Sequence, residues 1–285
     1  MFGNKTLDRL DQMLSEALSG TFQEEIYDET KLSRLETKWK RFLAASLLSK
    51  ENLAREKENV KSLVSDISHQ TKTPMTNIKL YVDLLEETLQ SDQTMERKEE
   101  ALGLLEEISR QTSKLEFLIQ SLTKVSRLES NIVEVKPVMQ KVDRLLEETI
   151  TDYSGKARTK KVAVRNTYDG NAKASFDYKW TKEALGNVLD NAIKYSKPES
   201  VITISVTEYE MYLAISVKDQ GIGIREENLS QIFGRFYRSE EVNQEEGVGI
   251  GLYLTREILK KEDGYIKVKS VYGEGSEFIF YLHKA

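Results

Sequence analysis

The sequence predicts a multidomain protein: an all-α helical hairpin that forms a dimeric four-helix bundle, followed by an α+β two-layer sandwich. Three observations support this fold class. Apolar residues recur every three or four positions across residues 60–128, as in amphipathic helices. From residue 132 onward, short segments of alternating apolar residues are separated by helical segments and glycine-rich turns. Strands separated from helices in this way indicate a mixed sheet with helices on one face.

The first helix of the hairpin carries a long apolar seam with one histidine on the opposite side. The seam comprises Val60, Val64, Ile67, Thr71, Pro74, Ile78, Val82, Leu85 and Leu89, which gives a period of about 3.5 residues. His69 lies about 200° around the helix from Ile67, so it faces away from the seam together with Asp66 and Thr73. Pro74 lacks the N–H that would bond to the carbonyl of Gln70, and we expect a kink there.

The second helix of the hairpin is expected from about residue 95 to residue 130. The polar stretch at residues 91–94 ends the first helix near Leu89, and a new seam then contains Ala101, Leu105, Ile108, Thr112, Leu115, Ile119, Leu122, Val125 and Leu128. Two long helices joined by a short connection are antiparallel neighbours. A lone hairpin leaves much of its seam in water, so we expect two chains to form a four-helix bundle. An intramolecular bundle with the preceding helices is the alternative.

Residues 1–59 are interpreted as a helical signalling linker. Apolar stripes at residues 7–17 and 32–43 predict helix over residues 5–60 with a break near Gly20. No internal core partner is evident for these stripes, which favours pairing with another copy of the chain. A simple helical linker and a coiled-coil relay both fit this pattern.

The remaining chain, residues 132–285, is predicted as the sandwich. We expect strands at residues 132–135, 162–166, 172–176, 201–206, 212–217, 266–270 and 277–282, and helices at residues 138–156, at residues 178–195 and from the second glycine cluster to about residue 261. Asp177 is a good N-cap for the second of these helices.

Composition excludes several classes of protein. The 285 residues carry a net charge of −5 and contain no cysteine and two histidines. A nucleic-acid footprint, disulfides, thiolate metal sites and His-rich metal sites are therefore not expected. No apolar run approaches the roughly 20 residues of a membrane span. We expect a cytoplasmic portion of a protein, and the sequence leaves open a membrane anchor preceding Met1.

One predicted helix presents an unusual polar face. Asn187, Asn191 and Lys194 stand at i, i+4 and i+7, so they share one side. Two amides and an ammonium suit a polyphosphate, and an asparagine carbonyl is a hard oxygen ligand for Mg²⁺ already balanced by phosphates. An ordinary solvated helix face is the alternative.

Two glycine clusters follow along the chain. Asp219, Gly221 and Gly223 come directly after a strand, where a carboxylate could accept a hydrogen bond from an exocyclic amine. Gly247, Gly249 and Gly251 open the next helix, whose N–H groups could cradle phosphate. Their spacing fits neither a P-loop nor a dinucleotide-binding fingerprint. The long segment between the clusters is typical of a lid, with Arg235 and Arg238 as candidate phosphate clamps.

In this order and spacing, the motifs resemble those of sensor histidine kinases of two-component systems. The match covers an H box at residues 65–81, an N box at residues 187–196, glycine boxes at residues 219–223 and 247–252, an F box at residues 232–238 and a final glycine motif at residues 273–276. The family combines a HisKA-type phosphoacceptor hairpin with the Bergerat ATP-binding fold shared with gyrase, Hsp90 and MutL. Residues 28–32 weakly resemble the connector of HAMP relays. The implied domains are residues 1–59, 60–131 and 132–285.

The resemblance implies an ATP- and Mg²⁺-dependent protein-histidine kinase. His69 would be the phosphoacceptor and would pass the phosphoryl group to an aspartate of a response regulator, which docks near Lys72, Met75, Thr76 and Lys79. By position in the motifs, Asn187 would bind Mg²⁺, Asn191 and Lys194 would lie near the phosphates, Tyr195 would pack by the adenine, Asp219 would read its amine, and Arg238 with the backbone of residues 247–251 would hold the triphosphate.

One position departs from the family pattern. An acidic residue, thought to accept the imidazole proton, usually follows the histidine, but Gln70 occupies that place and cannot act as a base. Asp66 or solvent is the alternative proton acceptor. Thr73 keeps the position that aligns water for phosphatase activity on the partner. An ATPase or clamp of the same fold, and a nucleotide-binding pseudokinase, are the alternative functions.

Overall fold

The computed structural model describes residues 31–90, 95–130, 134–242 and 247–284. The chain divides into two compact units, Met1–His69 and Gln70–Ala285. The boundary falls inside the first described helix, α2 (Lys31–Gln90), which runs on through Pro74 without interruption. The expected helix at residues 5–30 and the HAMP-like residues 28–30 lie outside the described part of the chain.

The described part of the first unit is the N-terminal portion of α2. Its apolar side chains lie largely in water, because Trp39, Phe42, Leu48, Leu53, Val60 and Val64 are 38–67% exposed. Trp39 and Phe42 meet edge to face with ring centroids 6.0 Å apart. This stretch therefore has no core of its own among the described residues.

The helical hairpin is completed by α3 (Met95–Glu129), which confirms the expected end of the first helix and the extent of the second. Along α3, one set of apolar side chains is about half exposed: Leu102, Leu105, Phe117 and Ile119. A second set, toward the end of α3, is buried: Leu118, Leu122, Val125 and Leu128. This end contacts α6 of the sandwich within the second unit.

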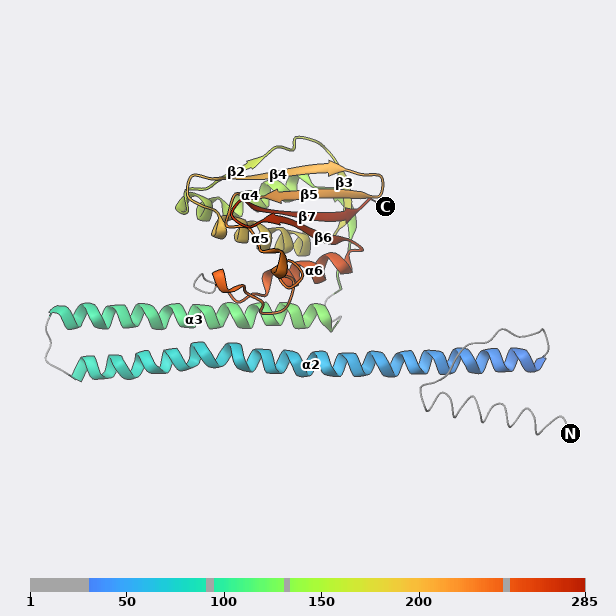
Figure 1. Ribbon diagram of the computed structural model, residues 1–285, viewed down its shortest axis with the longest axis horizontal. Coiled ribbons are helices and arrows are strands. Elements are labelled where there is room, and N and C mark those ends of the chain that lie inside the picture. Colours follow the sequence, from blue (N-terminus) through green and yellow to red (C-terminus); the bar gives the residue numbers. More distant parts are fainter. Residues whose placement is uncertain (1–30, 91–94, 131–133, 243–246, 285) are drawn as a thin grey trace. The chain divides into compact units, whose positions relative to one another are not determined.

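The sandwich contains a mixed sheet, as predicted (Figure 1). Its strands are β1 (Val138–Lys141), β2 (Ala163–Asn166), β3 (Lys173–Phe176), β4 (Val201–Glu208), β5 (Tyr212–Lys218), β6 (Tyr265–Val271) and β7 (Gly275–His283). Among these strands the order is β1-β3-β7-β5-β4-β2, with β6 paired to β7. The β2–β4 pair is parallel and the other pairs are antiparallel. The hairpins β4–β5 and β6–β7 match the sequence prediction.

Helices α4 (Asp143–Thr159), α5 (Tyr178–Tyr195) and α6 (Gly251–Lys261) cover one face of the sheet. Alternate residues of the central strands, including Leu213, Ile215, Phe280 and Leu282, point into this layer and are at most 1% exposed. Asp177 caps α5 as expected, since its side chain accepts from the N–H groups of Lys179 and Trp180. The core therefore fixes α5, the helix that carries the polar face.

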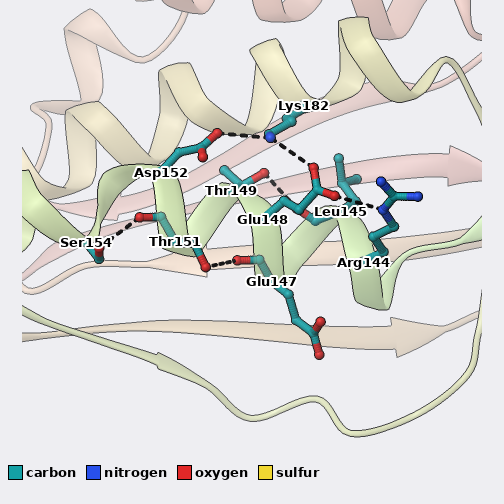
Figure 2. Close-up of polar contacts among 9 residues, drawn as sticks. All are labelled: Arg144, Leu145, Glu147, Glu148, Thr149, Thr151, Asp152, Ser154 and Lys182. Carbon is teal, nitrogen blue, oxygen red and sulfur yellow. Dashed lines mark hydrogen bonds and ion pairs between the residues drawn. The ribbon is translucent and has the colours of Figure 1, made fainter.

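Ion pairs also join α4 to α5 (Figure 2). Lys182 Nζ of α5 lies 3.1 Å from Glu148 Oε2 and 3.0 Å from Asp152 Oδ2 of α4. Arg144 Nε donates to the other oxygen of Glu148 at 2.8 Å. Because these groups are partly exposed, their ion pairs contribute little to the stability of the fold. Their main effect is to align the two helices.

Two sequence predictions at the start of the sandwich are wrong. The described residues 134–137 are irregular, whereas a strand was expected at residues 132–135. Residues 138–141 were expected in a helix but form β1, and α4 begins only at Asp143. Strand β1 pairs with β3, from Val138 opposite Phe176 to Lys141 opposite Lys173. This pairing is with a segment distant in sequence, so it is invisible to a local pattern.

Within the described residues, no helix combines the length and apolar character that crossing a lipid bilayer requires.

Candidate functional site: a cleft beside α5 and an exposed histidine

A cleft opens between α5, the end of β5, the segment at residues 222–242 and the start of α6. Of the predicted nucleotide-site residues, it is lined by Asn187, Asn191, Lys194, Tyr195, Asp219, Gly223, Arg238, Gly247, Gly249 and Gly251. Segments about sixty residues apart in sequence thus meet in one place. Two predicted residues, Gly221 and Arg235, do not line it.

The polar face of α5 forms one wall of the cleft. Asn187 Nδ2 donates to the carbonyl of Gly251 at 3.3 Å, which holds this amide against the start of α6. Because the amide nitrogen is engaged, Oδ1 is the atom with which Asn187 could bind a cation. Lys194 Nζ lies 3.2 Å from the hydroxyl of Tyr195 and 4.8 Å from its ring centroid.

Asp219 lines the cleft and is 6% exposed. Its Oδ1 accepts from the N–H of Gly221 at 2.8 Å and of Ser276 at 3.1 Å. Burial raises the pKa of Asp219, while these two backbone hydrogen bonds act in the opposite direction. Since both donors meet Oδ1, Oδ2 is the oxygen that can accept from an exocyclic amine of a ligand.

Gly223 shows why the first glycine cluster needs residues without a side chain. Its φ is +68°, and an added Cβ would lie 2.1 Å from the carbonyl oxygen of Val271. The N–H of Gly273 in the same β6–β7 turn donates to the carbonyl of Ile222 at 2.7 Å. The turn therefore packs closely on the first glycine cluster and fixes that edge of the cleft.

The two lid arginines proposed as phosphate clamps have different surroundings. Arg238 lines the cleft and donates to the carbonyl of Val242. Arg235 does not line the cleft. Its guanidinium instead reaches Glu129 at the end of α3 and Tyr253 in α6.

Several lining residues were missed by the sequence reasoning. Arg225 lies over the ring of Tyr272, 4.4 Å from its centroid, and Arg225 Nε donates to Glu241 Oε1 at 2.5 Å. All three line the cleft, as does Phe117 of α3. Tyr272 directly precedes the final glycine motif, which was the only sequence signal for its position.

The candidate phosphoacceptor is displayed on α2, not in the cleft. His69, Gln70 and Thr73 are exposed and Asp66 is half-buried. The positions expected to dock a partner, Lys72, Met75, Thr76 and Lys79, are exposed as well. The other histidine, His283, is half-buried in β7, with its ring edge-on to Tyr212 at 5.7 Å.

The donor set of the cleft is suited to a cation that arrives with phosphate. No group of three or more His, Cys, Asp or Glu side chains that could hold a metal occurs in the described part of the chain. Asn187 Oδ1 is a neutral hard oxygen, and Mg²⁺ in nucleotide sites takes most of its ligands from phosphates and water. The residues present therefore fit Mg²⁺ bound with a nucleotide better than a metal bound alone.

Comparison with known families identifies both halves of this architecture. Residues 176–285 match the family of histidine kinase-, DNA gyrase B- and HSP90-like ATPases. The sandwich with its glycine-lined cleft is therefore an ATP-binding domain of that class. Residues 59–131 match the His kinase A phospho-acceptor domain. The chain belongs to the sensor histidine kinases that combine these two domains.

Individual relatives agree with this assignment. Sensor protein SrrB of Staphylococcus aureus strain N315 is 29% identical over 226 residues, which are 79% of this chain and 38% of SrrB. The chain thus spans about two fifths of the length of the curated relatives it matches.

Two solved structures share the fold. The histidine kinase AdeS of Acinetobacter baumannii superimposes with a TM-score of 0.60 at 18% identity, over 75% of this chain and 97% of that one. The histidine kinase ThkA, solved in complex with the response regulator protein TrrA, gives a TM-score of 0.57 at 22% identity, over 91% of this chain and 69% of that one.

Proposed function

We propose that this chain is an ATP- and Mg²⁺-dependent protein-histidine kinase that phosphorylates His69 and passes the phosphoryl group to an aspartate of a response regulator. The observation that carries the proposal is the convergence, in one cleft, of every predicted ATP-site residue except Gly221 and Arg235. The exposure of His69 on α2 supports its role as acceptor, because a nucleophile must be reachable. The domains we propose are residues 1–59, 60–131 and 132–285.

Each wall of the cleft has a proposed task. Asp219 Oδ2 accepts from the adenine amine, and Tyr195 packs beside the base. Asn191, Lys194, Arg238 and the backbone from Gly247 to Gly251 hold the phosphates. Mg²⁺, held by Asn187 Oδ1, would neutralise charge on the transferring group. Catalysis of phosphoryl transfer is then mainly positioning and charge neutralisation, which this set of donors supplies.

The acceptor chemistry requires a neutral imidazole. A ring nitrogen of His69 attacks the γ-phosphorus, an N–P bond forms, and the P–O bond to the ADP leaving group breaks. The ring proton leaves to Asp66 or to solvent, since Gln70 cannot accept it. Replacing Asp66 with Asn separates these routes. An unchanged labelling rate would assign the proton to solvent, whereas a lower rate would assign it to Asp66.

We propose a homodimer and a receiver-domain partner. The exposed apolar residues of α3 and α2 suit a bundle formed by two hairpins. The solved complex of ThkA with TrrA supports a response regulator as partner. The exposed residues near His69, including Lys72 and Met75, form the surface we assign to it. Thr73 would orient the water that hydrolyses the phosphorylated partner.

Incubation with γ-labelled ATP tests the function. We expect label that is lost in acid and retained in alkali, and that is absent from His69→Ala. His283→Ala is the matched control and should label like the parent. ATP hydrolysis without labelling would indicate an ATPase or clamp of the same fold. Nucleotide binding without labelling or hydrolysis would indicate a pseudokinase, the alternative that Gln70 suggests.

A further inference from the structure

Three side chains from separate elements meet where α3 ends. Arg235 Nη2 of the lid donates to Glu129 Oε1 at 2.5 Å and to the hydroxyl of Tyr253 at 2.8 Å. The Tyr253 hydroxyl in turn donates to the same Glu129 oxygen at 2.5 Å. The last residue of α3, the lid and the first turn of α6 are thus joined by a closed triangle of hydrogen bonds.

This triangle is shielded from water. The side chain of Arg235 is 15% exposed, that of Glu129 is 26% exposed, and Tyr253 is 7% exposed. The guanidinium carbon lies 4.8 Å from the Tyr253 ring centroid, and Arg235 Nε is buried without a hydrogen-bond partner among the described residues. Charge-assisted hydrogen bonds are stronger in such surroundings, and removal of one partner leaves a buried charge uncompensated.

Arg235 is directly connected to the wall of the cleft. The next residue, Phe236, has φ +58°, and Tyr237 and Arg238 then line the cleft. The backbone of this segment crosses Gly249 so closely that an added Cβ there would lie 2.6 Å from the carbonyl oxygen of Tyr237. Because the segment packs so closely against Gly249, the position of Arg235 determines the positions of Tyr237 and Arg238.

We propose that Glu129 is a positioning residue for the nucleotide site. Through Arg235 and Tyr253 it fixes the lid segment 235–238 over the second glycine cluster, residues 247–251. Glu129 touches no part of the cleft itself. The end of the helical hairpin therefore sets nucleotide affinity, and a shift of α3 that separates Glu129 from Arg235 lowers it. By reciprocity, bound nucleotide strengthens the contact between α3 and the lid. This inference takes from the proposed function only the identity of the ligand.

Calorimetric titration of the full chain with ADP tests the inference. Glu129→Ala should weaken binding about tenfold, as expected for the loss of charge-assisted hydrogen bonds. Tyr253→Phe, which keeps the ring and removes the hydroxyl, should weaken binding by a smaller factor in the same direction. If Glu129→Ala does not fold, Glu129→Gln, which retains the acceptor oxygen, is titrated with ADP in its place. Unchanged ADP affinity in that variant would then overturn the proposal.

Lys124→Ala is the matched control. Lys124 Nζ of α3 pairs with Glu183 Oε1 of α5 at 2.7 Å. This ion pair also joins the helical hairpin to the sandwich, but it does not involve the lid. Its ADP affinity should stay within twofold of the parent. Equal losses in Lys124→Ala and Glu129→Ala, or no loss in the Glu129 variants, would overturn the proposal.

Two further measurements separate positioning from general damage. Arg235→Ala should add little to Glu129→Ala, because both act through one contact. The KM for ATP in His69 labelling should rise with the ADP dissociation constant while the rate at saturating ATP stays near that of the parent. Additive losses would count against the proposal. A parent chain that binds ADP but never labels His69 would refute the proposed function, and the binding titrations would still decide this inference.

Discussion

Glu262 is an ionisable residue buried outside the nucleotide cleft. It is 2% exposed at the end of α6, and its carboxyl group accepts from the Thr181 hydroxyl at 2.8 Å and from the Asp177 N–H at 3.0 Å. Burial raises the pKa of Glu262 to about 7, although these hydrogen bonds act in the opposite direction and the charge of Asp177 adds to the rise. The folded chain therefore holds this proton at a pH where the unfolded chain releases it.

The stability of the sandwich should fall as pH rises from about 4.5 to 7. Below that window Glu262 is protonated in both states, and above it the folded state carries a buried carboxylate, with a loss of about 3 kcal/mol in the free energy of unfolding. Glu262→Gln should remove this part of the pH dependence. Urea unfolding of both chains at pH 5 and pH 8 measures it. Parallel pH profiles would show that Glu262 is not the group responsible.

Thr73 allows the two proposed activities on α2 to be separated. If its hydroxyl orients the water that attacks the phosphorylated regulator, Thr73→Ala should slow dephosphorylation of that partner by about tenfold or more. Labelling of His69 from ATP should be unchanged and is the internal control. The measurement follows loss of label from a phosphorylated receiver domain. A loss of His69 labelling in the same variant would contradict this division of roles.

At the scale of elements, the second glycine cluster depends on the lid that crosses it. Gly249 has φ +74°, and an added Cβ would approach Tyr237 O at 2.6 Å. Gly249→Ala should therefore displace the lid and weaken ADP binding by about tenfold or more. Titration calorimetry measures this loss.

Gly103→Ala is the control for that variant. An added Cβ at Gly103 in α3 meets nothing within 4 Å, so the substitution should leave binding intact and raise stability by about 0.5–1 kcal/mol through helix propensity. Equal ADP affinity in both variants would show that the lid tolerates a side chain at Gly249.

The elements differ in how well their local sequence predicts them. Helix α5 begins and ends at the expected residues, because Asp177 caps it and its apolar face has a clear period. Strand β1 was expected as helix, since its four residues carry no periodic signal and pair with β3 more than thirty residues away. Short edge strands are defined by their partner, not by their own composition.

At the scale of the whole molecule, the half-exposed apolar residues of α3 predict the assembly. Ile119 lies on the predicted seam and is 53% exposed in the single chain. Ile119→Lys should dissociate the proposed dimer, because it places a charge where we expect the bundle core. Sedimentation velocity reports the mass. Lys114→Glu, at an exposed position on the opposite side of α3 from the seam, should leave the dimer intact, and a dimeric Ile119→Lys chain would exclude this seam as the interface.

The sequence by itself determined the class of protein, because the histidine, the asparagines and the glycine clusters occur in an order that few folds share. It also determined most helices and strands, since a period of 3.6 or 2 is a local property of the chain. The tertiary structure alone decided where Arg235 points, that Phe117 and Tyr272 line the cleft, and that Glu129 meets the lid. Those contacts join residues from separate elements of the chain, and packing of the complete core, not any local pattern, brings such residues together.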